Sequence, residues 1–523
     1  MYDAVIIGAG HNGLVCACYL AKAGLTVRLL ERRARVGGAA VTEEFHPGFR
    51  NSVAAYTVSL LQPKIIRELR LRERGLRIVE RPFANFLPLS ERDYLKIGPT
   101  LADTRREVAK FSEGDARRLP DYYRMIDGVA DVLRDLVLRT PPNVGGGARD
   151  ALAALKLGYD FFRLDMEARR DVYDLFTKSA ADVLERWFES DGIKAAFGFD
   201  AVVGNYASPY TPGSAYVLLH HAFGEVNGKR GAWGHAIGGM GAISEALAAE
   251  ARALGVDITC GAAVEKVEVR GGRAAAVVLA NGDVVEARAV VANVNPKLLY
   301  LQLMDARDLP AEFVERMRSY KCASATFRMN VALAELPRFA CLPEPGPHHA
   351  SGIILAPSLR YMERAYIDAR TDGMARAPIV EMVIPSTLDD SLAPPGRHVA
   401  SLFCQHFDPH ADWSTRKEEA VERIFDVIEA AAPGFRRSVI AWSALSPVDL
   451  EREFGLIGGD IFHGALTLDQ LFAARPILGY ADYRAPVRGL YLCGSGAHPG
   501  GGVTGAPGHN CAHELLRDFR RLR

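Results

Sequence analysis

The sequence predicts an α/β fold that begins with a parallel βαβ unit and carries a large insertion of mixed α and β structure. A short apolar run at 2–7 enters a glycine-rich turn at 8–13, and a second apolar run at 26–30 follows one helix later. Further short strands recur at 256–292 and 489–493. Strands that alternate with helices typically form a parallel sheet, so we expect one sheet built from distant parts of the chain.

The glycine-rich turn at 8–13 has the full context of a dinucleotide-binding motif, because it follows a buried strand and opens a helix. Gly8 permits a tight turn, Gly10 lets the backbone approach a pyrophosphate, and Gly13 lets helix and strand pack closely. The free N–H groups of the helix N-terminus favour phosphate. From this turn we expect cofactor contacts by Gly8, Gly10, His11, Asn12 and Gly13.

The second strand ends at Glu31, an acid placed 31 − 8 = 23 residues after Gly8. This spacing is close to the roughly 20 residues expected for the acid that binds the adenosine ribose hydroxyls. A carboxylate at this position disfavours the 2′-phosphate of NADP. The motif therefore leaves FAD and NAD as candidates.

A glycine pair follows soon after the ribose acid, in the stretch from Glu31 to Ala39. Here the sequence resembles flavoproteins of the glutathione-reductase-like kind, in the branch of amine oxidases and phytoene desaturases. The resemblance implies FAD as the cofactor, bound by a Rossmann domain. It also implies that Gly37, Gly38 and Ala39 lie beside the FAD phosphates, with Arg32 suited to a phosphate or the adenine.

The next expected elements belong to an inserted substrate region. Apolar residues at spacings of three and four predict helices over 101–111, 122–138 and 167–188. Further along, we expect strands of a second sheet, over 324–334, 350–355, 378–383 and 398–406.

A middle group of glycines at 231–241 precedes a predicted helix at 242–254. In the resembled family this segment returns the chain to the FAD domain, and the residue at the position of Val264 meets the adenine through its backbone. The turn at 238–241 has no strand running directly into it and no acid after the next strand. We therefore count one nucleotide-binding domain.

The last glycine-rich segment, at 494–505, lies between a predicted strand and a C-terminal helix over 506–519. It is similar to the G-x-G-x-H-P-G element of bacterial phytoene desaturases, where such a segment closes on the flavin. Ser495 stands near the place where many flavoproteins carry an Asp for the ribityl–phosphate chain. The site residues that the resemblance implies here are Gly494, Ser495, Gly501, Gly502 and Val503.

Three stretches, 225–241, 458–480 and 490–510, are similar to a subgroup of phytoene-dehydrogenase-like FAD oxidoreductases, that of pyridine nucleotide-disulfide oxidoreductase domain-containing protein 2. The resemblance implies a discontinuous FAD domain with an α+β substrate domain, a mixed sheet plus a helical cap, inserted between its parts. The implied divisions are FAD-binding parts at 1–75, 226–300 and 476–523, a helical cap region at 76–225, and a substrate domain with the mixed sheet at 301–475.

Composition excludes several other classes of protein. Lys plus Arg and Asp plus Glu are 63 each, and this zero net charge argues against a nucleic-acid partner. No apolar run is long enough for a transmembrane helix, and the N-terminus lacks a basic signal region, so we expect a cytoplasmic protein. Phe161-Phe162 and Trp187-Phe188 leave peripheral membrane contact open, although pairs at helical spacing are more often core.

The expected activity is dehydrogenation, that is desaturation, of a hydrophobic substrate of isoprenoid or polyene kind. Hydride would pass to flavin N5, with oxygen or a quinone as the final acceptor. Three alternatives stay open: an FAD amine or amino-acid oxidase, a non-redox FAD isomerase, and a flavin-bearing interaction protein. Homo-oligomerisation also stays open. The sequence has no Cys-x-x-Cys pair, which excludes a dithiol reductase scheme.

The polar residues that we single out as catalytic candidates are Tyr56, His235 and His463, each in a stretch that resembles the subgroup. His498 is expected to order the last glycine loop. The remaining histidines show no spacing typical of metal ligands, so we expect no metal site.

Overall fold

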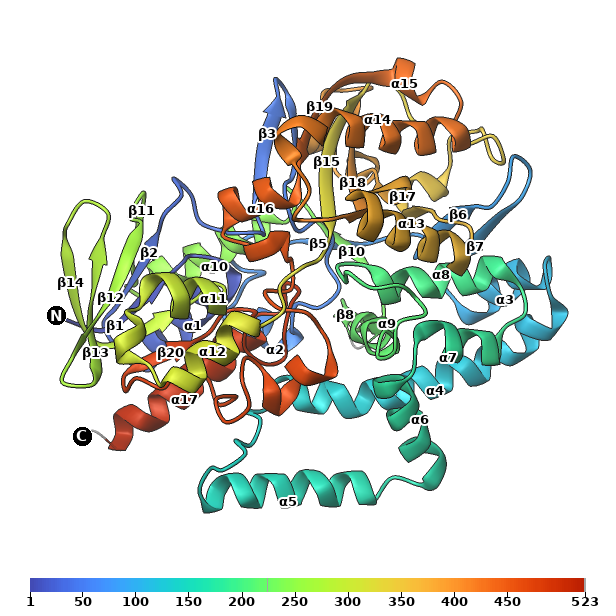
Figure 1. Ribbon diagram of the computed structural model, residues 1–523. Coiled ribbons are helices and arrows are strands. Elements are labelled where there is room, and N and C mark those ends of the chain that lie inside the picture. The colour runs from blue at the N-terminus through green and yellow to red at the C-terminus, as the bar shows by residue number, and fades with distance from the viewer. Residues whose placement is uncertain (223, 522–523) are drawn as a thin grey trace.

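The computed structural model describes residues 1–222 and 224–521 (Figure 1). It is an α/β structure with two mixed sheets, one on the left of Figure 1 and one at the upper right, and a helical region at the lower right. The first sheet holds the chain's N-terminal strand, and the helical region lies beside the second sheet.

The first sheet has the strand order β11-β2-β1-β14-β13-β12, with β20 paired to β14. Its bounds are β1 (Tyr2–Ile7), β2 (Val27–Glu31), β11 (Asp257–Cys260), β12 (Val264–Arg270), β13 (Arg273–Leu279), β14 (Val284–Ala292) and β20 (Leu490–Leu492). β1 pairs in parallel with both β2 and β14, and β14 pairs in parallel with β20. The predicted βαβ unit is therefore present, and segments from the start, middle and end of the chain share one sheet.

The helices against this sheet are α1 (His11–Lys22), α10 (Gly241–Ala253) and α17 (Ala506–Arg521). α1 packs between the other two, and its residues from His11 to Leu20 are buried. α1 begins at His11, directly after Gly10 and within the predicted glycine-rich turn at 8–13. The glycine turn and the helix N-terminus are thus one continuous feature.

The second sheet has the order β19-β15-β18-β17-β16-β6-β7. Its bounds are β6 (Asn85–Pro88), β7 (Tyr94–Ile97), β15 (Thr326–Leu333), β16 (Gly352–Leu355), β17 (Met374–Val383), β18 (His398–Phe407) and β19 (Val439–Leu445). The four predicted strands of this sheet are confirmed. β6 and β16 pair in parallel although they come from distant segments. Helices α13 (Leu359–Asp372) and α14 (Trp413–Ala431) pack on β17.

The helical region contains α3 (Leu101–Ala109), α4 (Glu113–Val137), α5 (Ala148–Phe162), α6 (Met166–Thr177), α7 (Ala180–Trp187), α8 (Asp191–Val202) and α9 (Ala215–Ala222). The predicted helix at 167–188 is two helices, because Ser179 caps α7 in a capping box with Asp182 and ends the run. The predicted helix at 122–138 begins earlier, at Glu113, since Ser112 caps it.

Helix α5 lies apart from the body of the molecule in Figure 1, and none of its residues is buried. The core prediction is right for Phe188, which is 2% exposed, and wrong for Phe162, which is 68% exposed. Among the residues described, no helix has the length and apolarity needed to cross a membrane. The short elements that join the larger ones are α2 (Pro63–Glu68), β3 (Thr42–His46), β4 (Phe49–Ser52), β5 (Ile78–Glu80), β8 (Glu225–Val226), β9 (Lys229–Arg230), β10 (Gly234–Ala236), α11 (Pro296–Leu298), α12 (Ala311–Ser319), α15 (Phe435–Ser438) and α16 (Pro447–Phe454).

Candidate cofactor and substrate site

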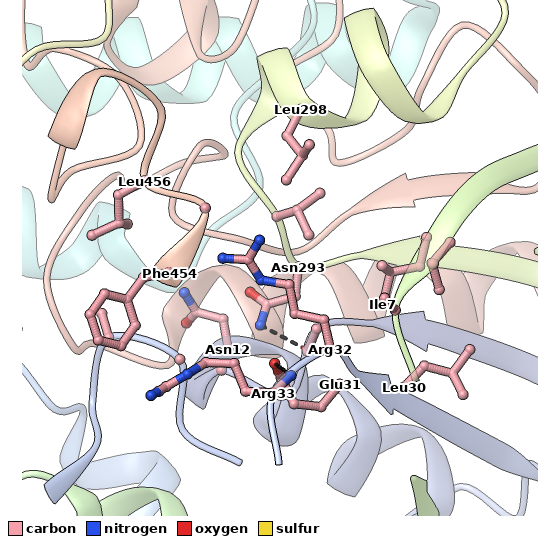
Figure 2. A pocket seen from close by; sticks show the side chains of 18 of the residues that line it. Ile7, Asn12, Leu30, Glu31, Arg32, Arg33, Asn293, Leu298, Phe454 and Leu456 are labelled. Carbon is pink, nitrogen blue, oxygen red and sulfur yellow. Dashed lines mark hydrogen bonds between the residues drawn. The ribbon is translucent and has the colours of Figure 1, made fainter. Parts of the chain in front are cut away.

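A cavity of about 260 Å³ lies where β1 and β2 end and α1 begins. Figure 2 shows Glu31 and Arg33 at its floor, with Phe454 and Leu456 on the side opposite Leu30. Many of the cofactor residues expected from the sequence line it, namely Gly8, Gly10, His11, Asn12, Glu31, Arg32, Gly38, Ala39, Val264 and Ser495. The cavity thus brings together residues from all three segments that build the first sheet.

Gly8, Gly10 and Gly13, at and just after the turn before α1, lie so close to neighbouring atoms that none has room for a Cβ. A Cβ on Gly13 would lie 2.3 Å from the carbonyl oxygen of Gly8, and one on Gly10 would lie 2.9 Å from Nδ2 of Asn293. Gly8 itself has a φ of +94°, which favours glycine. Gly38 approaches Gly10 from the other side. As a result, no side chain of their own covers the backbone at these glycines at the start of the helix.

The N-terminus of α1 has the character of an anion site. Within the described chain no side chain caps the helix, and its first turn carries no acidic residue. Its first N–H groups and the helix dipole therefore favour a phosphate. The buried Oδ1 of Asn12 and Nε2 of His11 also have no partner among the described residues. These features fit the pyrophosphate of a dinucleotide.

Glu31 is fixed at the end of β2 by two backbone groups. Its carboxylate accepts a hydrogen bond from the N–H of Ala9 at 2.8 Å and one from the N–H of Arg33 at 2.9 Å. The side chain is buried at the floor of the cavity. Each carboxylate oxygen keeps a second lone pair, so the group can accept hydroxyl donors from a ribose.

A second cavity of about 130 Å³ continues from the first. Four residues line both: His11, Ala39, His463 and Ser495. Tyr56, Gly502 and Val503 line the second cavity, so two of the three catalytic candidates meet there. Its walls are mostly aromatic and aliphatic: Leu60, Phe199, Val203, Phe403, Ile461 and Phe462.

The other glycines named from the sequence lie behind the cavity walls. A Cβ on Gly501 would lie 2.2 Å from the ring of Phe462, and one on Gly37 would lie 2.6 Å from the carbonyl oxygen of Ala40. Gly494 packs against Asn293. These positions hold the backbone that shapes the cavities, as does Gly13.

His463 stands at the junction of the two cavities. Burial, with the positive charge of Arg475, lowers its pKa to about 3, so the ring is neutral at neutral pH. Its buried Nδ1 has no partner among the described groups. A neutral ring with a free nitrogen at this place can contact a cofactor or a substrate by hydrogen bonding.

Arg475 holds the loops that carry His463 and Ser495, a role that the sequence did not reveal. Its guanidinium is fully buried and donates to the carbonyl oxygens of Phe462 at 2.7 Å and Ser495 at 2.8 Å. It also donates to the carbonyl of Gly464. One side chain therefore ties the loop after α16 to the C-terminal glycine segment.

His235, the third catalytic candidate, does not line the two cavities. Its Nε2 lies 3.0 Å from the carboxylate of Asp389, which also accepts the N–H of Gly238 at 2.7 Å. The side chain thus connects β10 and the turn before α10 to the segment between β17 and β18. In this structure the side chain of His235 contacts Asp389, outside the two cavities.

Tyr56 contacts Glu381, a buried polar residue that the sequence did not single out. Its hydroxyl donates to the carboxylate of Glu381 on β17, and the guanidinium of Arg328 lies 4.6 Å from its ring centroid. Burial and the charge of Glu381 raise the pKa of Tyr56 well above its ordinary value, so the hydroxyl keeps its proton. The sequence did contain a sign of this role, because Glu381 is the one charged residue within the apolar run Ile379–Val383.

Comparison with known proteins gives the family. The model of the flavin-containing amine oxidoreductases matches residues 13–508, nearly the whole chain. The chain belongs to this family. FAD is accordingly the cofactor, as the sequence predicted, and the protein is an FAD-dependent oxidoreductase.

Relatives agree with the resemblance seen in the motifs. The chain is 41% identical to pyridine nucleotide-disulfide oxidoreductase domain-containing protein 2 of Rattus norvegicus, over all of this chain and 94% of the relative. It is 27% identical to a lycopene-forming phytoene desaturase of Pseudescherichia vulneris, over 97% and 96% of the two chains. The resemblance to this subgroup and to the phytoene desaturases, which the motifs indicated, is confirmed.

A solved structure of putrescine oxidase bound to putrescine shares the fold, with a TM-score of 0.62 and 17% identity over 99% of each chain. The predicted α/β class is confirmed as an FAD-dependent amine-oxidase type of fold, with mixed sheets and helices.

Proposed function

We propose that this protein dehydrogenates a largely apolar substrate in the second cavity, with FAD bound in the first. Bound FAD supplies a hydride acceptor at its flavin ring. The observation that carries the proposal is the shared lining, since His463 and Ser495 border both cavities. In this proposal the FAD domain is of the glutathione-reductase-like kind, made of parts 1–75, 226–300 and 476–523.

The apolar walls of the second cavity do two things for such a reaction. Phe199, Phe403 and Phe462 exclude water, and they fix the substrate by shape. Tyr56 and His463 are the polar groups that we propose at the reacting end. His235 acts as a positioning residue, through Asp389 and the Gly238 turn. Oxygen or a quinone would take the electrons in the second half of the cycle.

Anaerobic reduction of the flavin distinguishes this proposal from its competitors. A relative is named for desaturating phytoene and a structural neighbour for oxidising putrescine, so these two compounds are the probes. We expect phytoene or a shorter polyene to bleach the flavin band at about 450 nm, and putrescine to leave it unchanged. Bleaching by the amine alone would select an amine oxidase.

Two further outcomes select the remaining alternatives. Product formed from the polyene with no electron acceptor present would indicate a non-redox isomerase. A flavin that no donor reduces, in a protein that forms a stable complex, would indicate an interaction protein. Both measurements use the same holoprotein.

We also propose that helix α5 contacts a membrane surface, where an apolar substrate would be dissolved. Its exposed apolar side chains support this, since Leu152, Leu155 and Phe162 are each more than 60% exposed. Co-sedimentation with phospholipid vesicles tests it. The double substitution Leu155→Glu and Phe162→Glu is expected to abolish co-sedimentation, and unchanged binding would exclude α5 as the contact.

A further inference from the structure

Asp200 carries a carboxyl group in the wall of the second cavity. It lies in the last turns of α8 and lines both the second cavity and a third one of about 440 Å³. Asn85 and Trp233 line the same two cavities. Among the residues described, no group donates a hydrogen bond to Asp200. Its carboxyl group can therefore form a hydrogen bond with a ligand in the cavity.

The surroundings of Asp200 favour its neutral form. Burial, and then the negative charge of Glu381, raise its pKa to about 8. The C-terminal end of a helix carries a partial negative charge, which acts in the same direction. At neutral pH the carboxyl therefore holds a proton and can donate a hydrogen bond to an oxygen atom.

The charges around the second cavity disfavour a cationic ligand. Glu381 faces Arg81, with 3.9 Å between Oε1 and Nη1, and both side chains are nearly fully buried. Arg328 is buried behind Tyr56. Two guanidinium groups therefore lie around the one carboxylate of this cavity and offset its negative charge, which weakens its attraction for a substrate ammonium group.

Two of the aromatic rings that line the cavity, those of Trp233 and Tyr56, already carry cations. The guanidinium of Arg81 lies 5.8 Å from the ring centroid of Trp233, and that of Arg328 lies 4.6 Å from the ring centroid of Tyr56. A ring face that holds a guanidinium is not free for a second cation. The cavity is thus largely apolar along its walls, and Asp200 offers a carboxyl group as a hydrogen-bond donor on the side shared with the third cavity.

We propose that Asp200 binds a hydroxyl or carbonyl oxygen at one end of an otherwise apolar substrate. The body of the substrate would lie against Phe199, Phe403 and Ile461. This inference deepens the proposed function by narrowing the substrate class to a lipid-like molecule with an oxygen at one end, which should bind more tightly than a pure hydrocarbon or an amine. It rests on the proposal that the second cavity is the substrate site.

Ligand binding without turnover tests the proposal. The probes are four molecules of equal chain length, 1-octanol, 2-octanone, octane and octylamine, titrated into the oxidised holoprotein at pH 7 while the flavin absorbance is followed. We expect the alcohol and the ketone to bind about tenfold more tightly than octane, and octylamine no more tightly than octane. Tightest binding by octylamine, or equal binding by all four, would overturn the proposal.

Variants at Asp200 assign the preference to this side chain. Asp200→Leu should bring the alcohol and the ketone to the affinity of octane, while octane itself binds at least as well as before. Asp200→Asn keeps an N–H donor and should keep the preference for the ketone. Asp191→Asn, at the exposed start of the same helix, is the matched control and should behave as the wild type. A preference that survives Asp200→Leu would contradict the assignment.

The two proposals fail in distinguishable ways. If no polyene or oxygenated lipid bleaches the flavin, the dehydrogenase proposal fails, yet the octyl series still reports what Asp200 binds. If bleaching occurs but the octyl series shows no preference for oxygen, only the role of Asp200 is overturned. Should Asp200→Leu not fold, the wild-type series and Asp200→Asn still decide the proposal.

Discussion

The Nε2 atom of His235 lies 3.0 Å from the carboxylate of Asp389, and both side chains are buried. Through this contact the segment between β17 and β18 is joined to the glycine turn that precedes α10. The two residues therefore connect the segment between two strands of the second sheet to the turn before α10, which packs beside the first sheet.

Loss of the Asp389 charge should destabilise the protein in a pH-dependent way. Burial acts to raise the pKa of Asp389, but hydrogen bonds from His235, Ser391 and Gly238 outweigh it and hold the pKa below its ordinary 3.8. We expect Asp389→Asn to lower the free energy of unfolding by about 2 kcal/mol at pH 7.

The sign of the pH effect follows from the depressed pKa. The stabilisation by the carboxylate is complete above the unfolded value near 3.8, and it is lost as the pH falls toward the folded value. The difference between wild type and Asp389→Asn should therefore be constant from pH 5 to 7 and shrink below about pH 4. Urea unfolding at several pH values measures it. A difference that grows on acidification would contradict this account.

Substitution of Gly13 should disrupt the packing of α1 on the first sheet. Its Cβ would lie 2.3 Å from the carbonyl oxygen of Gly8, which is backbone and cannot move away easily. We expect Gly13→Ala to cost about 3 kcal/mol or more in the free energy of unfolding, since overpacking forces the backbone to shift. Gly128→Ala in α4 has open space around it and is the control. It should be neutral or stabilise by up to about 1 kcal/mol.

Removal of the Glu31 charge should weaken FAD binding more than it weakens folding. Hydrogen bonds to a charged group contribute about 1.5–3 kcal/mol, so Glu31→Gln is expected to raise the Kd for FAD by about 10- to 100-fold. Quenching of FAD fluorescence on addition to the apoprotein measures the Kd. Glu268→Gln, whose side chain pairs with Arg270 on the surface, should leave it unchanged. Equal Kd values for wild type and Glu31→Gln would remove Glu31 from the cofactor site.

Arg475 should be needed both for stability and for FAD retention. Arg475→Ala leaves the carbonyl oxygens of Phe462, Gly464 and Ser495 without this donor, which we expect to cost about 3–5 kcal/mol. Thermal unfolding and the flavin content of the purified protein measure the two effects. Arg307→Ala, at a surface ion pair with Asp305, is the control and should leave stability close to that of the wild type. Full flavin content in Arg475→Ala would show that the two loops hold the cofactor site without it.

The cofactor half of the site could be predicted because its signals are local. The turn at 8–13, the acid Glu31 and the glycine segment at 494–505 are each indicated by spacing and by neighbouring strands, and the structure brings residues of all three to the first cavity. Backbone strain and helix-end charge act over a few residues, so short motifs are enough to reveal them.

The second cavity could not be predicted in the same way. Asp200 and Glu381 come from a helix and a strand that are distant in sequence, and only the packed fold places both in one cavity. The exposure of α5 was also missed, since its apolar spacing is the same for a core helix and for a helix that faces outward. Tertiary packing, and not local pattern, decides both.

A crystal structure of the protein with FAD bound tests the central claim most directly. This account predicts the pyrophosphate at the N-terminus of α1, the adenosine ribose on Glu31, and the flavin ring in contact with His463, facing the cavity that contains Tyr56 and Asp200. A flavin ring that points away from this cavity, or a pyrophosphate bound elsewhere, would contradict it.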